Sequence, residues 1–201
     1  MNASNVFTLN KIIDYLKQTD ADIICLQEVL YSQFLFLKKS LKVYGEFGAN
    51  VNNKALKYGI AILSKNKILH KSHVFLKSKG EQRGFLYTNI FFASGCIDVI
   101  NTHLGLNKDE RKEQVNEIIN YTKRLSKSLI ICGDFNEKNI FINTFNDSSI
   151  YTNNHNIETF KKSIARIDYI LVDKSLCIDK YKVEKINLSD HYPIISYINL
   201  N

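Results

Sequence analysis

The chain has 201 residues, of which 45% are hydrophobic and 23% charged, and its formal net charge is +7. This composition is typical of a globular protein, and the length allows one domain with a substantial core, which we expect to span residues 1–201. With one proline and eight glycines the chain is neither collagen-like nor disordered, and no apolar run approaches the ~20 residues of a membrane span. The N-terminal sequence lacks the pattern of a secretory signal. The positive charge favours an anionic partner without identifying it.

The first half of the chain alternates helices with apolar strands. Apolar residues at helical spacing predict two helices, and short apolar runs predict four strands. The expected elements are helices at 6–18 and 34–41 and strands at 21–29, 58–65, 84–93 and 96–104. Ser94 and Gly95, between the last two strands, suit the turn of a hairpin.

The second half begins with a helix and continues with three strands. Asn107 opens the helix, with Glu110 three positions later in an arrangement close to a capping box. Apolar runs predict strands at 128–134, 165–173 and 191–199. Residues 143–163 are polar and weakly patterned, and we expect a long loop of the kind that carries function in compact domains. About seven strands with three helices indicate stacked sheets flanked by helices.

The four cysteines are widely spaced, and no two of them have the spacing of a metal site. They are Cys25, Cys96, Cys132 and Cys177. Three of them lie in or beside apolar runs, where cysteine behaves as a small hydrophobic residue. We therefore expect all four to be reduced residues in or near the core of a cytoplasmic protein. We also expect this protein to be a monomer.

Five apolar strands end at, or are interrupted by, acidic side chains or histidines. These residues are Glu28, His103, Asp134 with Asn136, Asp168, and Asp190 with His191. A carboxylate beside buried strands is costly unless it has a partner or a metal ion. If the strand ends converge, three or four acids would crowd together, and a divalent cation would neutralise them. Hard oxygen ligands without a thiolate pair favour Mg²⁺ or Mn²⁺, for which Glu28 and Asp190 would serve.

Each of these residues also has an explanation that involves no ligand. Asp168 could form an ion pair with Arg166 or Lys162. Arg83, which precedes a strand, could be an ordinary solvent-exposed arginine. The remaining carboxylates and histidines could be surface groups, turn caps or hydrogen-bonded structural residues.

Several short segments carry a family resemblance. They are LQE, RG before a strand, NTHL, GDFN, RIDYILV and SDHYPI, and they occur in this order. This set resembles the endonuclease/exonuclease/phosphatase superfamily, which includes DNase I-like nucleases, inositol phosphatases and neutral sphingomyelinases. The combination of GDFN with a later SDH is specific, whereas any one motif alone would be weak. The resemblance implies an α/β (α+β) fold, a four-layer sandwich in which two central mixed β-sheets are flanked by helices.

The resemblance implies roles in binding a metal ion and activating water. Glu28 corresponds to the main metal-ligand glutamate, and Asp190 to an aspartate at the same metal site. Asp134 corresponds to the aspartate that activates the attacking water. The expected cofactor is Mg²⁺ or Mn²⁺.

The remaining residues correspond to groups around the substrate phosphate. Asn136 matches the asparagine that orients the phosphate, and Arg83 an arginine near it. His191 matches the histidine that contacts the scissile phosphate and is held by Asp168. Such a pair would raise the pKa of the histidine and favour its cationic form. His103 is a candidate acid for the leaving group.

These assignments predict a divalent-metal-dependent phosphoesterase that hydrolyses a phosphodiester with an activated water. The expected partner is a phosphoester, with nucleic acid as one candidate and a nuclease as one form of the enzyme. One alternative is a phosphatase or phospholipase that acts on a small phosphoester or a lipid headgroup. The other is a truncated or degenerate relative that binds without catalysis. This second alternative follows from one difference between the chain and the family pattern. Family members usually open with a strand that carries an asparagine, and we expect that first strand to be missing here.

Overall fold

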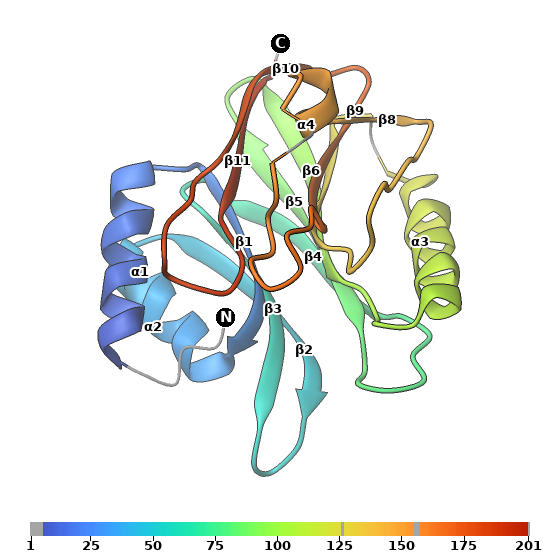
Figure 1. Cartoon of the computed structure of the whole chain (residues 1–201). Helices are drawn as coiled ribbons and strands as arrows, with labels where there is room; N and C mark the ends of the chain where they lie inside the picture. The colour runs from blue at the N-terminus through green and yellow to red at the C-terminus, as the bar shows by residue number, and fades with distance from the viewer. Residues whose placement is uncertain (1–5, 126, 155–156, 201) are drawn as a thin grey trace.

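The computed structural model describes residues 6–125, 127–154 and 157–200. The chain forms a four-layer sandwich, with two helices on one outer side, two layers of strands in the middle and a third helix on the other outer side (Figure 1). This is the α+β sandwich that the sequence predicts. None of the described helices is long and apolar enough to cross a membrane.

The larger layer of strands is a six-stranded sheet in the order β4-β5-β6-β7-β9-β8. Its strands are β4 (Ile68–Phe75), β5 (Gly84–Phe92), β6 (Gly95–His103), β7 (Leu129–Asp134), β8 (Phe145–Asp147) and β9 (Asp168–Asp173). β6 and β7 run parallel, and the other neighbours run antiparallel, so this sheet is mixed. The predicted hairpin joins β5 to β6, with Ala93 and Ser94 in its turn.

The other layer of strands is divided into two parts. One part is an antiparallel sheet in the order β1-β3-β2, formed by β1 (Ile23–Leu30), β2 (Tyr44–Asn52) and β3 (Lys57–Ser64). The other is an antiparallel ribbon of β10 (Cys177–Val183) and β11 (Ile194–Asn199). Over the described residues, no strand pairing joins the ribbon to the three-stranded sheet. Both parts pack against the same six-stranded sheet through apolar side chains.

The helices cover the outer faces of the two layers. α1 (Val6–Thr19) and α2 (Tyr31–Leu41) pack on β1 and β3 in one apolar cluster. α3 (Lys108–Thr122) packs on the six-stranded sheet through Ile118. As predicted, Asn107 caps α3, because its side chain accepts hydrogen bonds from two backbone N–H groups of the first turn. A short helix, α4 (Ser148–Tyr151), lies within the segment for which the sequence predicts a loop.

Two expectations about cysteines need correction. Cys132 is buried and Cys25 half-buried, as expected, but Cys96 and Cys177 are exposed. Cys96 lies beside the turn before β6, and Cys177 is the first residue of β10, so neither reaches the core. All four thiols are free.

Strand register places several predicted site residues in one row. Gly84 of β5 pairs with His103 of β6, His103 pairs with Asp134 of β7, and Asp134 pairs with Asp168 of β9. Residues that pair across a sheet project from the same face. The side chains of His103, Asp134 and Asp168 therefore emerge side by side at one end of the sheet.

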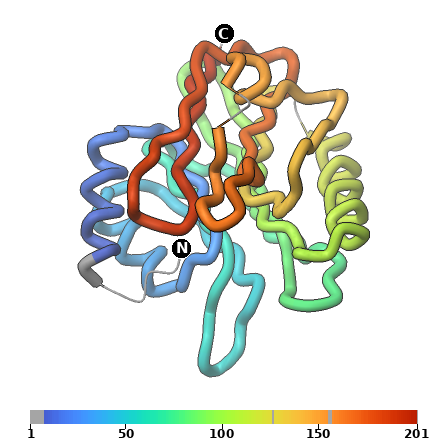
Figure 2. The backbone as a smooth tube through the Cα atoms, in the orientation of Figure 1, coloured from blue at the N-terminus to red at the C-terminus, as the bar shows by residue number. Residues whose placement is uncertain are grey.

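Two loops from the C-terminal half pass in front of this end of the sheet. Residues 157–167 and 184–193 lie side by side, as the orange and red parts of the tube in Figure 2 show. The backbone N–H of Tyr192 donates to the carbonyl oxygen of Thr159 at 2.7 Å, and Phe160 forms a bridge with His191. These contacts bring His191 to the row formed by the strands.

Gly133 allows β7 to approach β6 closely at the end that carries Asp134. Its φ is +139°, and a Cβ at this position would lie 1.9 Å from the carbonyl oxygen of Thr102. Residues other than glycine rarely adopt this φ, and there is no space for a side chain. The glycine of the GDFN motif is therefore a requirement of the backbone.

We predict that Gly133→Ala destabilises the fold by about 3 kcal/mol or more, because the added methyl group meets backbone atoms that cannot move away. Urea denaturation would measure the loss. Gly80→Ala is the matched control, since a Cβ at Gly80 has no atom within 4 Å. A Gly133→Ala protein as stable as the Gly80→Ala protein would show that the close approach of β7 to Thr102 imposes no constraint.

Candidate active site

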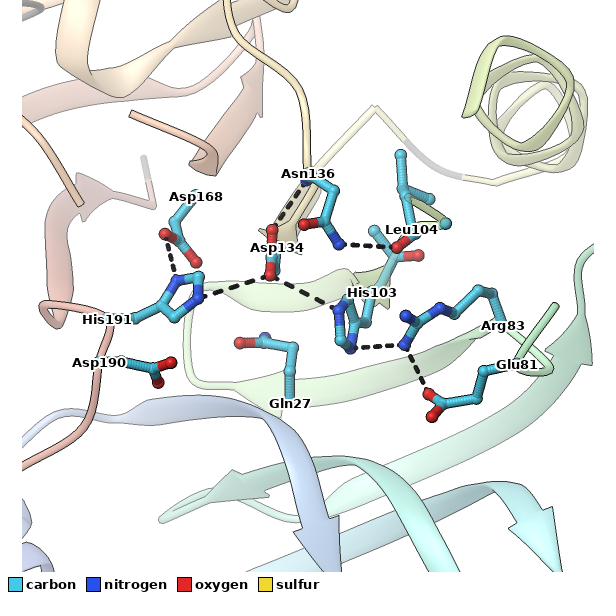
Figure 3. Close-up of polar contacts among 12 residues, drawn as sticks. Gln27, Glu81, Arg83, His103, Leu104, Asp134, Asn136, Asp168, Asp190 and His191 are labelled. Carbon is cyan, nitrogen blue, oxygen red and sulfur yellow. Dashed lines mark hydrogen bonds and ion pairs between the residues drawn. The ribbon is translucent and has the colours of Figure 1, made fainter. Parts of the chain in front are cut away.

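Polar side chains from four separate segments meet at one end of the six-stranded sheet (Figure 3). His103 comes from the end of β6, Asp134 from the end of β7, Asp168 from the start of β9, and His191 from the segment before β11. His103, Asp134 and Asp168 are buried, and His191 is half-buried. The structure thus brings together the residues that the sequence placed at distant strand ends.

Asp134 is at the centre of the cluster. Its Oδ1 accepts a hydrogen bond from the backbone N–H of Asn136 at 2.8 Å. Its Oδ2 faces two imidazoles, 3.5 Å from Nε2 of His103 and 3.8 Å from Nε2 of His191. Burial, followed by the charge of Asp168, raises the pKa of Asp134 from 3.8 to about 7, against the opposing effects of His191 and the Asn136 N–H. A carboxylate with this pKa is suited to act as a general base near neutral pH.

Burial and the neighbouring Arg83 together determine the protonation of His103. Nη1 of Arg83 lies 3.2 Å from Nδ1 of His103 and 2.7 Å from Oε1 of Glu81. A guanidinium can only donate, so Nδ1 accepts and the imidazole proton is on Nε2, which faces Asp134. Burial and the Arg83 charge lower the pKa of His103 to about 3, so this histidine is neutral. Arg83 is itself buried, which excludes the solvent-exposed alternative.

His191 has the opposite electrostatic environment. Its Nδ1 lies 2.9 Å from Oδ2 of Asp168. Burial alone lowers the pKa of His191, but the hydrogen bond and charge of Asp168, together with the charge of Asp134, outweigh it and raise the pKa overall. The predicted effect of the Asp168–His191 pair on this pKa is therefore confirmed.

The alternative partners of Asp168 are engaged elsewhere. Arg166 pairs with Asp147 at 2.8 Å, and Lys162 pairs with Asp190 at 3.1 Å. The carboxylate of Asp168 is thus left to orient His191. Its backbone N–H donates to Oγ1 of Thr159 at 3.1 Å, which fixes the start of β9.

Asn136 connects the end of β7 to the segment after β6. Its φ is +50°, which asparagine tolerates better than most residues, and its Nδ2 donates to the carbonyl oxygen of Leu104 at 2.9 Å. The side chain is therefore fixed beside Asp134, as Figure 3 shows.

One described group can supply ligands to a metal ion. Asp134, Asp168 and His191 offer ligand atoms that lie within 4.8 Å of one another. Glu28, a predicted ligand, lines one cavity together with Asp134, Asp168 and His191, and its charge helps to raise the pKa of Asp134. Asp190, the other predicted ligand, is partly exposed and bound to Lys162. The crowding of carboxylates around Asp134 fits a divalent cation, because a cation would relieve their mutual repulsion.

Sequence reasoning missed several residues that support this site. Gln27 faces the cluster in Figure 3, and its Nε2 donates to Oδ1 of Asn101 at 2.6 Å. Thr159 and Phe160 come from the weakly patterned segment, and the Phe160 ring lies 4.6 Å from the His191 ring between centroids. Gln27 is part of the LQE segment and could have been selected, whereas nothing in the local sequence distinguishes Thr159 or Phe160.

Comparisons with known proteins identify a family, a curated relative and solved structures that are similar to this chain. The family model described as Endonuclease/Exonuclease/phosphatase family matches residues 2–191. The uncharacterized protein YbhP of Escherichia coli strain K12 is 28% identical over 151 residues, which cover 65% of this chain and 60% of YbhP. The chain thus spans about 60% of the length of this curated relative.

Two solved structures illustrate the shared fold. TDP2 of D. rerio, complexed with a single-strand DNA product, has a TM-score of 0.83 at 18% identity and covers 98% of this chain and 94% of its own. The mannosyl-6-phosphatase Bt3783 of Bacteroides thetaiotaomicron has a TM-score of 0.81 at 20% identity, with coverages of 96% and 91%. At these identities the likeness concerns the fold alone.

We predict that Asp134→Asn makes the fold more stable at pH 8, by an amount on the order of 2 kcal/mol. The raised pKa means that folding penalises the charged carboxylate, so the wild type loses stability as pH rises from about 4 to about 7. Asparagine does not ionise, and its Oδ1 can still accept from Asn136. Thermal unfolding between pH 5 and pH 8 would show that Asp134→Asn is more stable than the wild type, by a difference that becomes smaller at the lower pH.

The control for this measurement is Asp14→Asn, which alters an exposed aspartate on α1. We expect it to leave the pH dependence of stability unchanged. An Asp134→Asn protein whose stability follows that of the wild type at every pH would show that Asp134 carries no electrostatic penalty.

Proposed function

The chain belongs to the endonuclease/exonuclease/phosphatase family, and on that premise we propose that it is a divalent-metal-dependent phosphoesterase that hydrolyses a phosphodiester. The observation that carries the proposal is the Asp134 carboxylate, buried between the imidazoles of His103 and His191. A base flanked by hydrogen-bond donors suits the attack of water on an anionic phosphate, because the donors stabilise the charge that develops.

Asp134 is the proposed general base. It removes a proton from water while the water oxygen forms a bond to phosphorus. The bond from phosphorus to the leaving oxygen breaks, and that oxygen departs with the bonding pair and takes a proton from solvent water. The sequence makes His103 the candidate acid, but its neutral state means that it offers the Nε2–H as a hydrogen-bond donor to this oxygen and does not transfer the proton.

The other residues are proposed to hold the phosphate. The cationic form of His191, which Asp168 stabilises, would offset the charge of the phosphoryl oxygens. Asn136 and Arg83 are proposed to orient and attract the phosphate from the other side of Asp134. Arg83 would act partly through His103, because its guanidinium contacts that ring.

The proposed cofactor is Mg²⁺ or Mn²⁺. Glu28 and Asp190 are the proposed ligands, since both are oxygen donors beside the Asp134 cluster. When bound, such an ion would neutralise charge on the phosphoryl oxygens and lower the pKa of a bound water. Binding at Asp190 would compete with its ion pair to Lys162.

The nature of the substrate is a separate part of the proposal. The net charge of +7 favours an anionic polymer such as nucleic acid. A phosphatase or phospholipase acting on a small phosphoester or lipid headgroup is the alternative, and a mannosyl-6-phosphatase shares the fold. The second alternative is a relative that binds without catalysis. Four free thiols support a reducing location such as the cytoplasm.

We predict that the protein hydrolyses a generic phosphodiester when Mg²⁺ or Mn²⁺ is present and stops when EDTA is added. Asp134→Ala should reduce kcat at least about 100-fold, because the base is lost. Asp14→Asn, on the exposed face of α1, should retain full activity. A panel of plasmid DNA, abasic DNA, RNA, inositol phosphates and sphingomyelin would identify the substrate class. Turnover unaffected by Asp134→Ala would remove this residue from the mechanism, and absence of turnover on the whole panel would favour the non-catalytic alternative.

We also predict that Asp168→Asn moves the pH–rate profile to lower pH by about one unit. The Asp168 charge raises the pKa of His191 and of Asp134, so its removal shifts both limbs of the profile in the same direction. Asp173→Asn, at the other end of β9, should leave the profile in place. Loss of rate in the Asp168→Asn enzyme without any shift of either limb would argue against this electrostatic role.

A further inference from the structure

The inner face of the first turns of α3 is polar. Glu110 and Gln114 are buried, and the side chain of Arg111 is only 11% exposed. We call these three residues the polar face of α3. Apolar packing begins further along the helix, at Val115 and Ile118. A buried polar group is costly unless it forms hydrogen bonds, so the polar face needs partners elsewhere in the molecule.

Arg111 connects the segments that follow β6 and β7. Its Nη1 donates to the carbonyl oxygens of Gly105 at 3.2 Å and of Leu106 at 2.6 Å. Its Nε and Nη2 donate to Oε2 of Glu137 at 3.1 Å and 2.6 Å. The hydrogen bond from Arg111 lowers the pKa of Glu137, so this carboxylate is charged at neutral pH. One guanidinium thus holds both segments at once.

The same two segments determine where Asn136 lies. Asn136 immediately precedes Glu137, and its φ of +50° persists only where the surrounding structure holds it. Its Nδ2 donates to the carbonyl oxygen of Leu104, and its backbone N–H donates to Oδ1 of Asp134, as Figure 3 shows. The backbone N–H of Leu104 in turn donates to the carbonyl oxygen of Asp134 at 2.9 Å. The place of the Asn136 carboxamide therefore depends on the separation of the segments that Arg111 joins.

The rest of the polar face of α3 supports a third segment, between β4 and β5. Nε2 of Gln114 donates to the carbonyl oxygen of Lys77 at 2.9 Å. Oε2 of Glu110 accepts from the backbone N–H of Lys79 at 3.2 Å. This segment ends at Arg83, directly before β5. The polar face therefore contacts three of the segments that border the candidate active site.

We propose that Arg111 is a positioning residue, which fixes the separation of the segments after β6 and β7 and so holds the Asn136 side chain where it orients the phosphate. This inference rests on the proposed function, in which Asn136 has that role. Arg111 does not bind the phosphate itself, because all three of its guanidinium nitrogens already donate to protein oxygens. Lysine would not replace it, since an ammonium group is a compact charge whereas the planar guanidinium spreads its donors over both segments.

Hydrogen exchange tests the proposal without reference to activity. In Arg111→Gln we expect the backbone amides of Leu104 and Asn136 to exchange at least tenfold faster than in the wild type, because their segments open more easily. The amide of Ile131 within β7 should exchange at an unchanged rate. The matched control is Lys112→Gln, which alters an exposed cation on the same turn of α3 and should change none of these rates.

Kinetics on the phosphodiester that the wild type hydrolyses test the consequence for the reaction. Arg111→Gln and Arg111→Lys should each lower kcat at least tenfold, whereas Lys112→Gln should not. If Arg111 acts through Asn136, adding Arg111→Gln to Asn136→Ala should lower kcat less than twofold further. A general structural role would instead add its full loss to that of Asn136→Ala. Circular dichroism would establish that every variant remains folded.

Unchanged exchange in Arg111→Gln, unchanged kcat, or losses that add in full with Asn136→Ala would each overturn the proposal. If the wild type hydrolyses no substrate, the proposed hydrolysis fails, and binding of inorganic phosphate followed by NMR replaces turnover. Arg111→Gln should then weaken phosphate binding at least tenfold in the wild-type background and less than twofold in the Asn136→Ala background. Equal weakening in both backgrounds, or a wild type that binds no phosphate, would overturn the positioning role.

Discussion

The shared register of β6, β7 and β9 is the constraint on which the site depends. It places His103, Asp134 and Asp168 opposite one another, so three residues from separate strands project from one end of a single sheet. The parallel pairing of β6 with β7 is essential, because it brings the C-terminal ends of two strands to the same level. Gly133 makes this pairing possible by allowing the backbone of β7 to approach Thr102. The local backbone geometry thus determines which ionisable side chains lie next to one another in the site.

The two imidazoles beside Asp134 are chemically different because their outer neighbours differ. Burial and the charge of Arg83, which donates to His103, keep that ring neutral, while Asp168 accepts from His191 and favours its cation. The result is a carboxylate with a neutral donor on one side and a positive charge on the other. This asymmetry suits a reaction in which charge passes from an attacking water to a leaving oxygen. The cost is a buried carboxylate that destabilises the fold at neutral pH.

The sequence predicted the central strands and the three long helices, because these segments have strong patterns, and it predicted the residues that the structure gathers in the candidate site, namely His103, Asp134, Asp168 and His191. It missed β2, β4, β8 and β10, all of which lie at the edges of their sheets. Edge strands bury less of each side chain, so their alternation of apolar and polar residues is weak. The buried state of Arg83 was beyond prediction, since it depends on contacts between residues distant in the chain. Thr159 and Phe160 were missed for the same reason. The pairing of Asp168 with His191 was expected from the family resemblance, and neither local sequence alone indicates it.

The division of the second layer separates the site into a firmly held half and a less constrained half. His103, Asp134 and Asp168 belong to the six-stranded sheet, whose central strands pair on both sides. Glu28 lies in β1 and His191 in the segment before β11, and over the described residues each of these strands pairs with one other strand and is only partly buried. Elements with fewer buried contacts open locally at a lower free energy than the core does. The proposed general base is therefore fixed by the sheet, whereas a proposed metal ligand and the histidine proposed to be cationic lie on elements that open at a lower free energy.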